Sequence, residues 1–170
     1  MDKRCANCGG TMVTVRIDAR FCSTRCRVAG NRREKKSLGF PSELTSGRRW
    51  VRADGKRPIA VDGSPAKSND SSTWSYFADV RLSSAGNGFG VMLGGGLGCY
   101  DFDKVTDDEA RDLISLIPER VLFVERSVSG NGVHVFVASE ESAGSKKWQG
   151  RHERYTRQRF ILTTGNRISL

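Results

Sequence analysis

The sequence predicts an α+β protein: helices packed on one face of a mixed sheet, with a small zinc-binding module ahead of it. In the second part of the chain, short stretches that alternate with a period of two are interleaved with amphipathic helical stretches, which is typical of a sheet covered by helices. Four of the five cysteines lie in the first 26 residues, in two close pairs. We therefore expect a zinc-binding module with a basic helix over residues 1–36, a linker over 37–48 and a larger second domain over 49–170.

The cysteine spacing predicts the metal. Cys5 and Cys8 are separated by two residues, and Cys22 and Cys26 by three. Each spacing can place two thiolates on one side of a tight turn, and four thiolates complete the tetrahedral shell that Zn²⁺ prefers. A closed shell leaves no open position, so we expect a structural Zn²⁺ that stabilises a module too small to bury a core. Unligated cysteines are the alternative.

Within the module we expect a strand over residues 11–17 and a helix over 24–36. Residues 37–48 mix Ser, Gly and Pro without helical periodicity, which favours a linker. The helix predicts a phosphate-binding surface, although a merely solvated basic face is the alternative. Its cations are Arg25, Arg27, Arg32, Arg33, Lys35 and Lys36.

The net charge of +9 is unevenly distributed. Residues 1–40 carry +7, residues 101–140 carry −5 and residues 141–170 carry +5. Basic ends around an acidic middle are typical of a protein that binds a polyanion outside and cations inside; solubility alone is the alternative. No apolar run reaches the length of a membrane span, and no secretory signal is visible at the start. We therefore expect a cytoplasmic protein with no membrane partner.

The expected elements of the second domain begin with a hairpin and a helix. Strands over 49–52 and 57–61 flank a turn at 53–55. A helix then runs from Ser71 or Ser72 through Leu82 and turns Trp74, Phe77 and Val80 inward.

A glycine turn at 94–96 separates two further strands, 89–93 and 97–103. Thr106 and Glu109 form a capping box ahead of a helix over 107–117. The remaining strands are expected over residues 121–128, 133–138, 151–156 and 160–164.

Three polar stretches lie on these strands. In the first, Asp101 and Asp103 share one strand face, because side chains alternate, and Tyr100 and Phe102 share the other. Two adjacent carboxylates repel unless a cation lies between them, so the pair predicts a site for Mg²⁺ or Mn²⁺. A strand-end pair that faces water is the alternative. Cys99 shares the aspartate face and is interpreted as a packing residue.

The second stretch runs from Ser127 to Phe136. Gly130 and Gly132 permit a turn whose backbone N–H groups can form an anion nest. His134 lies on the polar face of its strand, opposite Val133 and Val135, where it can donate to a phosphate oxygen. A hydrogen-bonded structural histidine beside a hairpin is the alternative.

The third stretch runs from Glu153 to Gly165. Glu153 and Tyr155 share a face, and Arg157 and Arg159 bring positive charge to the same region. An exposed edge hairpin with ordinary charges is the alternative.

Taken together, residues 49–167 resemble the archaeo-eukaryotic primase superfamily, in its bifunctional primase-polymerase (Prim-Pol) branch of phages and plasmids. That branch shows an Asp-x-Asp strand, a Ser-x-Gly-x-His-like turn and strand, and a third acid in a Glu-x-Tyr segment followed by an Arg-Phe strand ending in Thr-Gly. Order and spacing match here at Asp101 and Asp103, at Ser129 to His134, and at Glu153 to Gly165. Residues 56–74 resemble the entry to the same domain.

The resemblance implies an RRM-like palm and a template-directed nucleotidyltransferase, a DNA primase and polymerase of phage or mobile-element replication. It implies Asp101, Asp103 and Glu153 as ligands of two Mg²⁺ or Mn²⁺ ions. His134, with Ser129 and Gly130, would hold the triphosphate of the incoming nucleotide. Arg159 and either Lys146 or Lys147 are assigned there from charge and position only.

The implied partners are single-stranded or primed DNA and nucleoside triphosphates. Because replicative relatives carry a helical accessory domain and often a helicase, a separate helicase or helical subunit is a further expected partner. A phage-encoded protein would work in the bacterial host cytoplasm.

Two other functions compete with the enzyme. The first is a non-catalytic, zinc-containing nucleic-acid-binding protein on a primase-like scaffold. The second is a metal-dependent nuclease, which we disfavour because the histidines His134 and His152 are not paired on one strand as relaxase-type nucleases need. The presence of all three acids and the histidine favours the polymerase.

Overall fold

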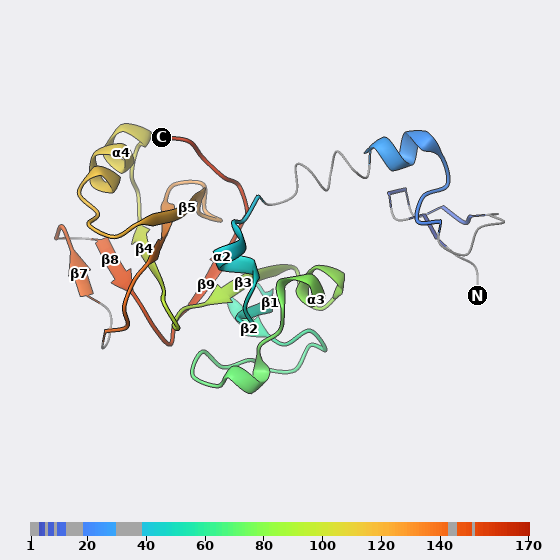
Figure 1. Ribbon diagram of the computed structural model, residues 1–170, viewed down its shortest axis with the longest axis horizontal. Coiled ribbons are helices and arrows are strands. Elements are labelled where there is room, and N and C mark those ends of the chain that lie inside the picture. The colour runs from blue at the N-terminus through green and yellow to red at the C-terminus, as the bar shows by residue number, and fades with distance from the viewer. Residues whose placement is uncertain are drawn as a thin grey trace. The chain divides into compact units, whose positions relative to one another are not determined.

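The computed structural model describes residues 4–5, 7–8, 10–12, 19–29, 39–142, 146–150 and 152–170 (Figure 1). The chain divides into two compact units, Met1–Gly39 and Phe40–Leu170, and each is described by itself. The strand expected over 11–17 and the second half of the helix expected over 24–36 lie largely outside the described residues. No helix in the described part of the chain is long and apolar enough to cross a membrane.

The first unit is organised by short-range hydrogen bonds around its cysteines. Arg4 and Thr11 form an antiparallel bridge, and the N–H of Cys5 donates to the carbonyl of Gly10 at 2.9 Å, so the first cysteine pair lies in a tight reversal. Residues 24–29 are helical. Ser23 begins this helix, because its hydroxyl accepts from the N–H of Cys26 at 3.1 Å.

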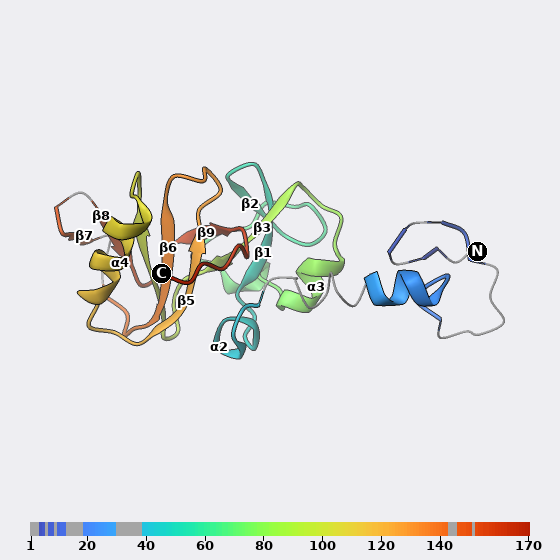
Figure 2. The same cartoon turned by 90° about the horizontal axis from the view of Figure 1, so that it is seen from above.

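The second unit contains two antiparallel sheets. The four-stranded sheet has the order β2-β1-β3-β9, formed by Arg57–Ile59, Trp50–Asp54, Gly88–Met92 and Phe160–Thr163. The five-stranded sheet has the order β5-β6-β4-β8-β7, formed by Val121–Arg126, Val133–Ala138, Leu97–Phe102, His152–Tyr155 and Lys146–Trp148. Figures 1 and 2 show the two sheets side by side within this unit.

The α+β class is confirmed, but the mixed sheet is wrong, since every pairing of neighbouring strands is antiparallel. The reason lies in the connection through the helix α4 (Asp107–Ser115). This helix crosses between β4 and β5, which run parallel, as expected of a helical crossover. The strand β6 then returns as a hairpin and inserts between them, so the two parallel strands never pair.

Helix α4 covers one face of the five-stranded sheet. Tyr100, Phe102, Val133 and Val135 form a buried cluster with Ala110 of the helix. The predicted capping box is confirmed: the hydroxyl of Thr106 accepts from the N–H of Glu109, and the N–H of Thr106 donates to the Glu109 carboxylate. The opposite face of this sheet is therefore free to carry the polar side chains.

The helix expected over residues 71–82 is broken into two. A 3-10 helix, Ser71–Thr73, is capped by Asp70, whose carboxylate accepts from the N–H of Ser72. The chain then extends, and Ser75 bridges to Trp50 beside the first sheet before α3 (Phe77–Leu82) begins. Short polar side chains that bond locally compete with helix propagation, and the bridge to Trp50 holds the extended form. Phe77 and Val80 are buried as predicted.

Residues 40–47, which we expected in the linker, pack into the second unit instead. They contain the helix α2 (Ser42–Thr45), and Leu44 within it is fully buried. The Phe40 ring packs 4.9 Å from that of Trp50 and 4.8 Å from that of Phe123. The Trp50 indole N–H donates to the carbonyl of Leu44 at 2.8 Å. The burial of Phe40 and Leu44, which are four residues apart, therefore outweighs the tendency of the surrounding Ser, Gly and Pro residues to form a linker.

Candidate active site and cysteine cluster

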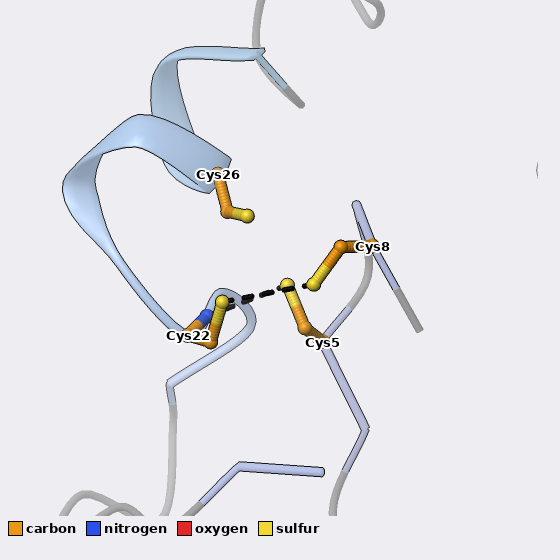
Figure 3. A group of neighbouring side chains, drawn as sticks. All are labelled: Cys5, Cys8, Cys22 and Cys26. Carbon is orange, nitrogen blue, oxygen red and sulfur yellow. Dashed lines mark hydrogen bonds between the residues drawn. The ribbon is translucent and has the colours of Figure 1, made fainter. Parts of the chain in front are cut away.

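The four predicted cysteines come together in the first unit. Figure 3 shows Cys5, Cys8, Cys22 and Cys26 pointing toward one another, with ligand atoms all within 4.8 Å of each other. The sulfurs of Cys8 and Cys22 lie 3.7 Å apart. This geometry can hold a metal such as zinc.

The thiols of the cluster differ in how readily they ionise. The backbone N–H of Cys22, with that of Cys8, lowers the pKa of Cys5 to about 6. Contact with the side chains of Cys26 and Cys5 raises the pKa of Cys22 to about 12. One thiolate therefore forms readily while its neighbour resists a second negative charge, a conflict that a divalent cation removes.

A row of polar residues crosses all five strands of the second sheet. Residues directly opposite one another on neighbouring antiparallel strands point to the same face. The paired positions run, in strand order from β5 to β7, through Glu125, His134, Asp101, Glu153 and Lys147. This cross-strand row lies on the face opposite the α4 cluster.

The aspartate pair of β4 contributes two members of the site. Asp101 is half-buried on the strand, whereas Asp103 is exposed just after the strand ends. Burial raises the pKa of Asp101, and the charges of Asp103 and Glu153 add to the rise. His134 and Arg159 act in the opposite direction. Burial and the two neighbouring carboxylates therefore both disfavour a negative charge on Asp101.

His134 is more deeply held than the sequence predicts. Its ring is on the polar face, as expected, yet the residue is buried with only 8% of its surface exposed. Nδ1 lies 3.0 Å from Oε1 of Glu125, and Nε2 lies 3.7 Å from Oδ1 of Asp101. Nδ1 therefore faces Glu125 and Nε2 faces Asp101, and the tautomer with its proton on Nδ1 donates to the Glu125 carboxylate.

Glu125 is a site residue that the sequence interpretation missed. It is fully buried, and its second oxygen accepts from the N–H of Thr164 at 3.1 Å and that of Gly165 at 2.8 Å. A charged residue at an inward position of a predicted strand, directly ahead of the His134 hairpin, was the available signal. The Thr-Gly pair that follows β9 suits this role, because the Thr164 hydroxyl also donates to Glu125 at 3.3 Å and Gly165 adopts a positive φ of 66°.

The turn before His134 is tightly closed. The N–H of Gly130 donates to the carbonyl of Ser127, and that of Asn131 to the hydroxyl of Ser129. These two amides of the turn in which we expected an anion nest are thus already engaged within the turn. A Cβ on Gly132 would lie 2.7 Å from the carbonyl of Phe102, so only glycine fits there.

Glu153 is already engaged on both oxygens. One lies 3.1 Å from Nζ of Lys147, and the other accepts from the hydroxyl of Tyr155. The Tyr155 hydroxyl and Lys147 lower the pKa of Glu153. The Arg159 guanidinium stacks 4.4 Å above the Tyr155 ring. The side chain of Lys146 lies outside what the structure describes.

Most of the predicted site residues line one pocket of about 720 Å³. Lys56, in the β1–β2 turn, also lines this pocket and was not predicted from the sequence. We call it the carboxylate pocket. Gly130 is not among its lining residues. Among the described residues, the four cysteines are the one group of three or more His, Cys, Asp or Glu side chains whose ligand atoms lie close enough together to hold a metal ion. The predicted residues that line the pocket are Asp101, Asp103, Ser129, His134, Glu153 and Arg159.

No protein-family model matches the chain, and no curated protein matches its sequence.

Proposed function

We propose that the chain is a template-directed nucleotidyltransferase, a primase-polymerase that adds nucleotides to a 3′-hydroxyl. The observation that carries the proposal is the cross-strand row: His134, Asp101 and Glu153 lie in direct register and line one pocket with Asp103. These are the residues on which the sequence resembles Prim-Pol proteins, and they come from three different strands. The RRM-like palm belongs to the same proposal.

The carboxylates supply hard oxygen ligands of the kind that Mg²⁺ and Mn²⁺ take. Asp101, Asp103 and Glu153 would hold the ions, with Lys147 moving away from Glu153 as the cation replaces it. When bound, such ions stabilise charge on a transferring phosphoryl group and activate the attacking oxygen. The raised pKa of Asp101 fits this role, because burial and the charges of Asp103 and Glu153 disfavour its ionised form, which a bound cation would stabilise.

The remaining side chains fit a triphosphate. With its proton on Nδ1, His134 donates a hydrogen bond to Glu125, which leaves Nε2 to take up a proton and then donate to a phosphate oxygen. Arg159 and Lys56 add positive charge to the pocket wall. A volume of about 720 Å³ lies within the usual range for small-molecule sites, so a nucleotide has room beside the carboxylates.

The first unit has a supporting role in the proposal. A structural zinc would fix the fold of the cysteine cluster, and the basic residues that follow would contact single-stranded or primed DNA. A separate helicase or helical subunit would complete a phage or mobile-element replication system in the host cytoplasm.

Incorporation of a labelled nucleotide on a primed template, with Mg²⁺ or Mn²⁺, tests the proposal. Asp101→Asn should abolish incorporation, while Asp108→Asn should leave it unchanged. Asp108 is a matched control, since it lies on the exposed side of α4 and pairs with Arg111. Incorporation by Asp101→Asn at the wild-type rate would refute the polymerase.

A non-catalytic nucleic-acid-binding protein is the second candidate. The engagement of Glu153 by Lys147 and Tyr155 favours it, because a carboxylate with both oxygens bonded is a weaker metal ligand. The two candidates separate cleanly, since a wild-type protein that binds template but incorporates nothing with either metal is the binding protein.

A further inference from the structure

A second pocket, about 320 Å³ in volume, adjoins the carboxylate pocket, and Ser68 and Gln158 line both. Its wall carries three arginines and a tryptophan: Arg48, Arg49, Arg157 and Trp74. We call it the arginine pocket. One acid also lines it, Glu141, whose carboxylate accepts from the N–H of Gly95 at 2.6 Å and is held against the β3–β4 turn.

We propose that the arginine pocket binds single-stranded nucleic acid and leads the strand toward the carboxylate pocket. This proposal rests on the proposed function only in that the protein binds a nucleic acid, and it does not require that the protein catalyses a reaction. Guanidinium groups recognise phosphate, and an aromatic face offers a platform on which a base stacks. The combination within one pocket is typical of sites for single strands, whose bases are free to stack.

The three arginines differ in how much of their donor capacity the protein uses. Arg49 donates to the carbonyls of the glycine turn, at 2.7 Å for Gly94, yet its Nε is buried with no hydrogen-bond partner in the described chain. Arg48 is exposed and donates to the carbonyl of Trp74 at 2.8 Å. Arg157 is exposed and forms neither an ion pair nor a hydrogen bond with the described residues. The described part of the chain therefore uses none of its side-chain donors, which suits a phosphate contact.

Trp74 is held so that its ring, and not its N–H, is offered. The indole N–H already donates to the carbonyl of Lys67 at 2.8 Å. The ring packs against the buried cluster of Val51 and Met92 while it also lines the pocket. A ring fixed in this way loses little conformational entropy when a base stacks on it.

One tight turn connects the two pockets. Arg157, Gln158 and Arg159 link β8 to β9, and Gln158 adopts a positive φ of 50°. The N–H of Gln158 donates to the carbonyl of Leu93, and the N–H of Leu93 to the carbonyl of Arg159, which pins the turn to the first sheet. As a result Arg157 lines the arginine pocket and Arg159 the carboxylate pocket. Adjacent phosphates of one strand could be held on either side of Gln158.

The test is fluorescence anisotropy of a labelled oligothymidylate about ten nucleotides long, with the full chain, over a series of salt concentrations and without added nucleotide. Arg157→Gln should weaken binding several-fold and flatten the log–log salt slope by about 0.7, the contribution of one phosphate contact on a single strand. The control is Arg111→Gln, which removes the same charge from α4, where Arg111 pairs with Asp108. It should change the affinity and the salt slope much less than Arg157→Gln does.

Trp74→Ala should weaken binding about 5- to 150-fold, the range for one stacked base, whereas Trp74→Phe should retain most of the affinity. The proposal would be overturned if the Arg157→Gln and Arg111→Gln proteins had the same affinity and the same salt slope. The outcome is independent of catalysis, because binding is measured without added nucleotide and no incorporation can occur. Arginine-dependent binding without any incorporation would support the arginine pocket and refute the polymerase alone.

Discussion

Nδ1 of His134 lies 3.0 Å from Oε1 of Glu125, and Glu125 is fully buried. A buried carboxylate is costly unless its oxygens are bonded, and here the other oxygen accepts from the backbone of Thr164 and Gly165. The pair therefore ties three segments together: β5, β6 and the chain after β9. It also fixes which nitrogen of His134 faces the carboxylate pocket, so Glu125 is a positioning residue.

Glu125→Gln should lower both stability and nucleotide use. The amide oxygen can keep the N–H groups of Thr164 and Gly165 only if the NH₂ turns to Nδ1 of His134. The fold then loses a charged acceptor of hydrogen bonds, and we expect a loss of about 2 kcal/mol in the free energy of unfolding. Denaturant titration measures this loss. Thr164→Ser, which keeps the hydroxyl that bonds Glu125 and Arg126, should cost much less.

Nitrogen NMR of the His134 ring separates positioning from packing. The chain has two histidines, so the spectrum is simple to assign. Neutral His134 should carry its proton on Nδ1 in the wild type and shift its tautomer in Glu125→Gln. An unchanged tautomer in a folded Glu125→Gln protein would contradict the positioning role.

Asp101→Asn should raise the melting temperature at pH 7. Burial, with Asp103 and Glu153 nearby, raises the pKa of Asp101 in the folded protein. An acid with a raised folded pKa stabilises the fold when protonated, and that stability is lost as pH rises through the folded pKa. Asn mimics the protonated form, so the gain should be present at pH 7 and shrink below the ordinary carboxyl pKa. Thermal melts at pH 7 and at a pH below the ordinary carboxyl pKa measure this gain in melting temperature.

The control is Asp108→Asn, which changes an exposed aspartate in the first turn of α4 and should bring no gain. A lower melting temperature for Asp101→Asn than for the wild type would mean that Asp101 stabilises the fold. Added Mg²⁺ should raise the melting temperature of the wild type and not that of Asp101→Asn.

The sequence predicts local features of this chain better than long-range ones. The capping box of Thr106 and Glu109 and the cysteine spacing depend on residues a few positions apart, and both are found as predicted. Asp101, His134 and Glu153 could be named from motifs, but their alignment in one row depends on strand register. Register is set by which strands pair, and that is not encoded in any single stretch.

The misses have the same cause. The insertion of β6 between β4 and β5 makes the sheet antiparallel, and no local pattern reports it. Glu125 looks like an ordinary strand charge until Thr164 and Gly165, about forty residues later, supply its donors. The strand β7, Lys146–Trp148, was missed because three residues are too few for an alternation to be recognised.

Cys22→Ser should abolish zinc binding. The four thiolates are expected to bind about one Zn²⁺ per chain, and three thiolates with a hydroxyl form a far weaker shell. Elemental analysis of protein purified without chelator measures the content. Cys99→Ala is the matched control, because Cys99 is buried in β4 of the second unit and should keep the zinc. Equal zinc in the two variants would rule out the cluster as the site.

Two truncated chains test where the second unit begins. Phe40 and Leu44 pack on Trp50, with Leu44 fully buried, so a chain that starts at Phe40 should melt like the second unit of the full protein. A chain that starts at Arg48 loses both side chains and should melt at least about 5 °C lower, because removing one buried leucine alone costs about 2–5 kcal/mol. Leu44→Ala in the full chain should reproduce much of this loss, since it opens the same cavity without shortening the chain. The control is Glu43→Ala, which changes the residue next to Leu44. Glu43 is exposed and pairs with Arg120 at the surface, so its loss should change the free energy of unfolding little. Equal melting of the chains starting at Phe40 and Arg48 would show that residues 40–47 act as a linker after all.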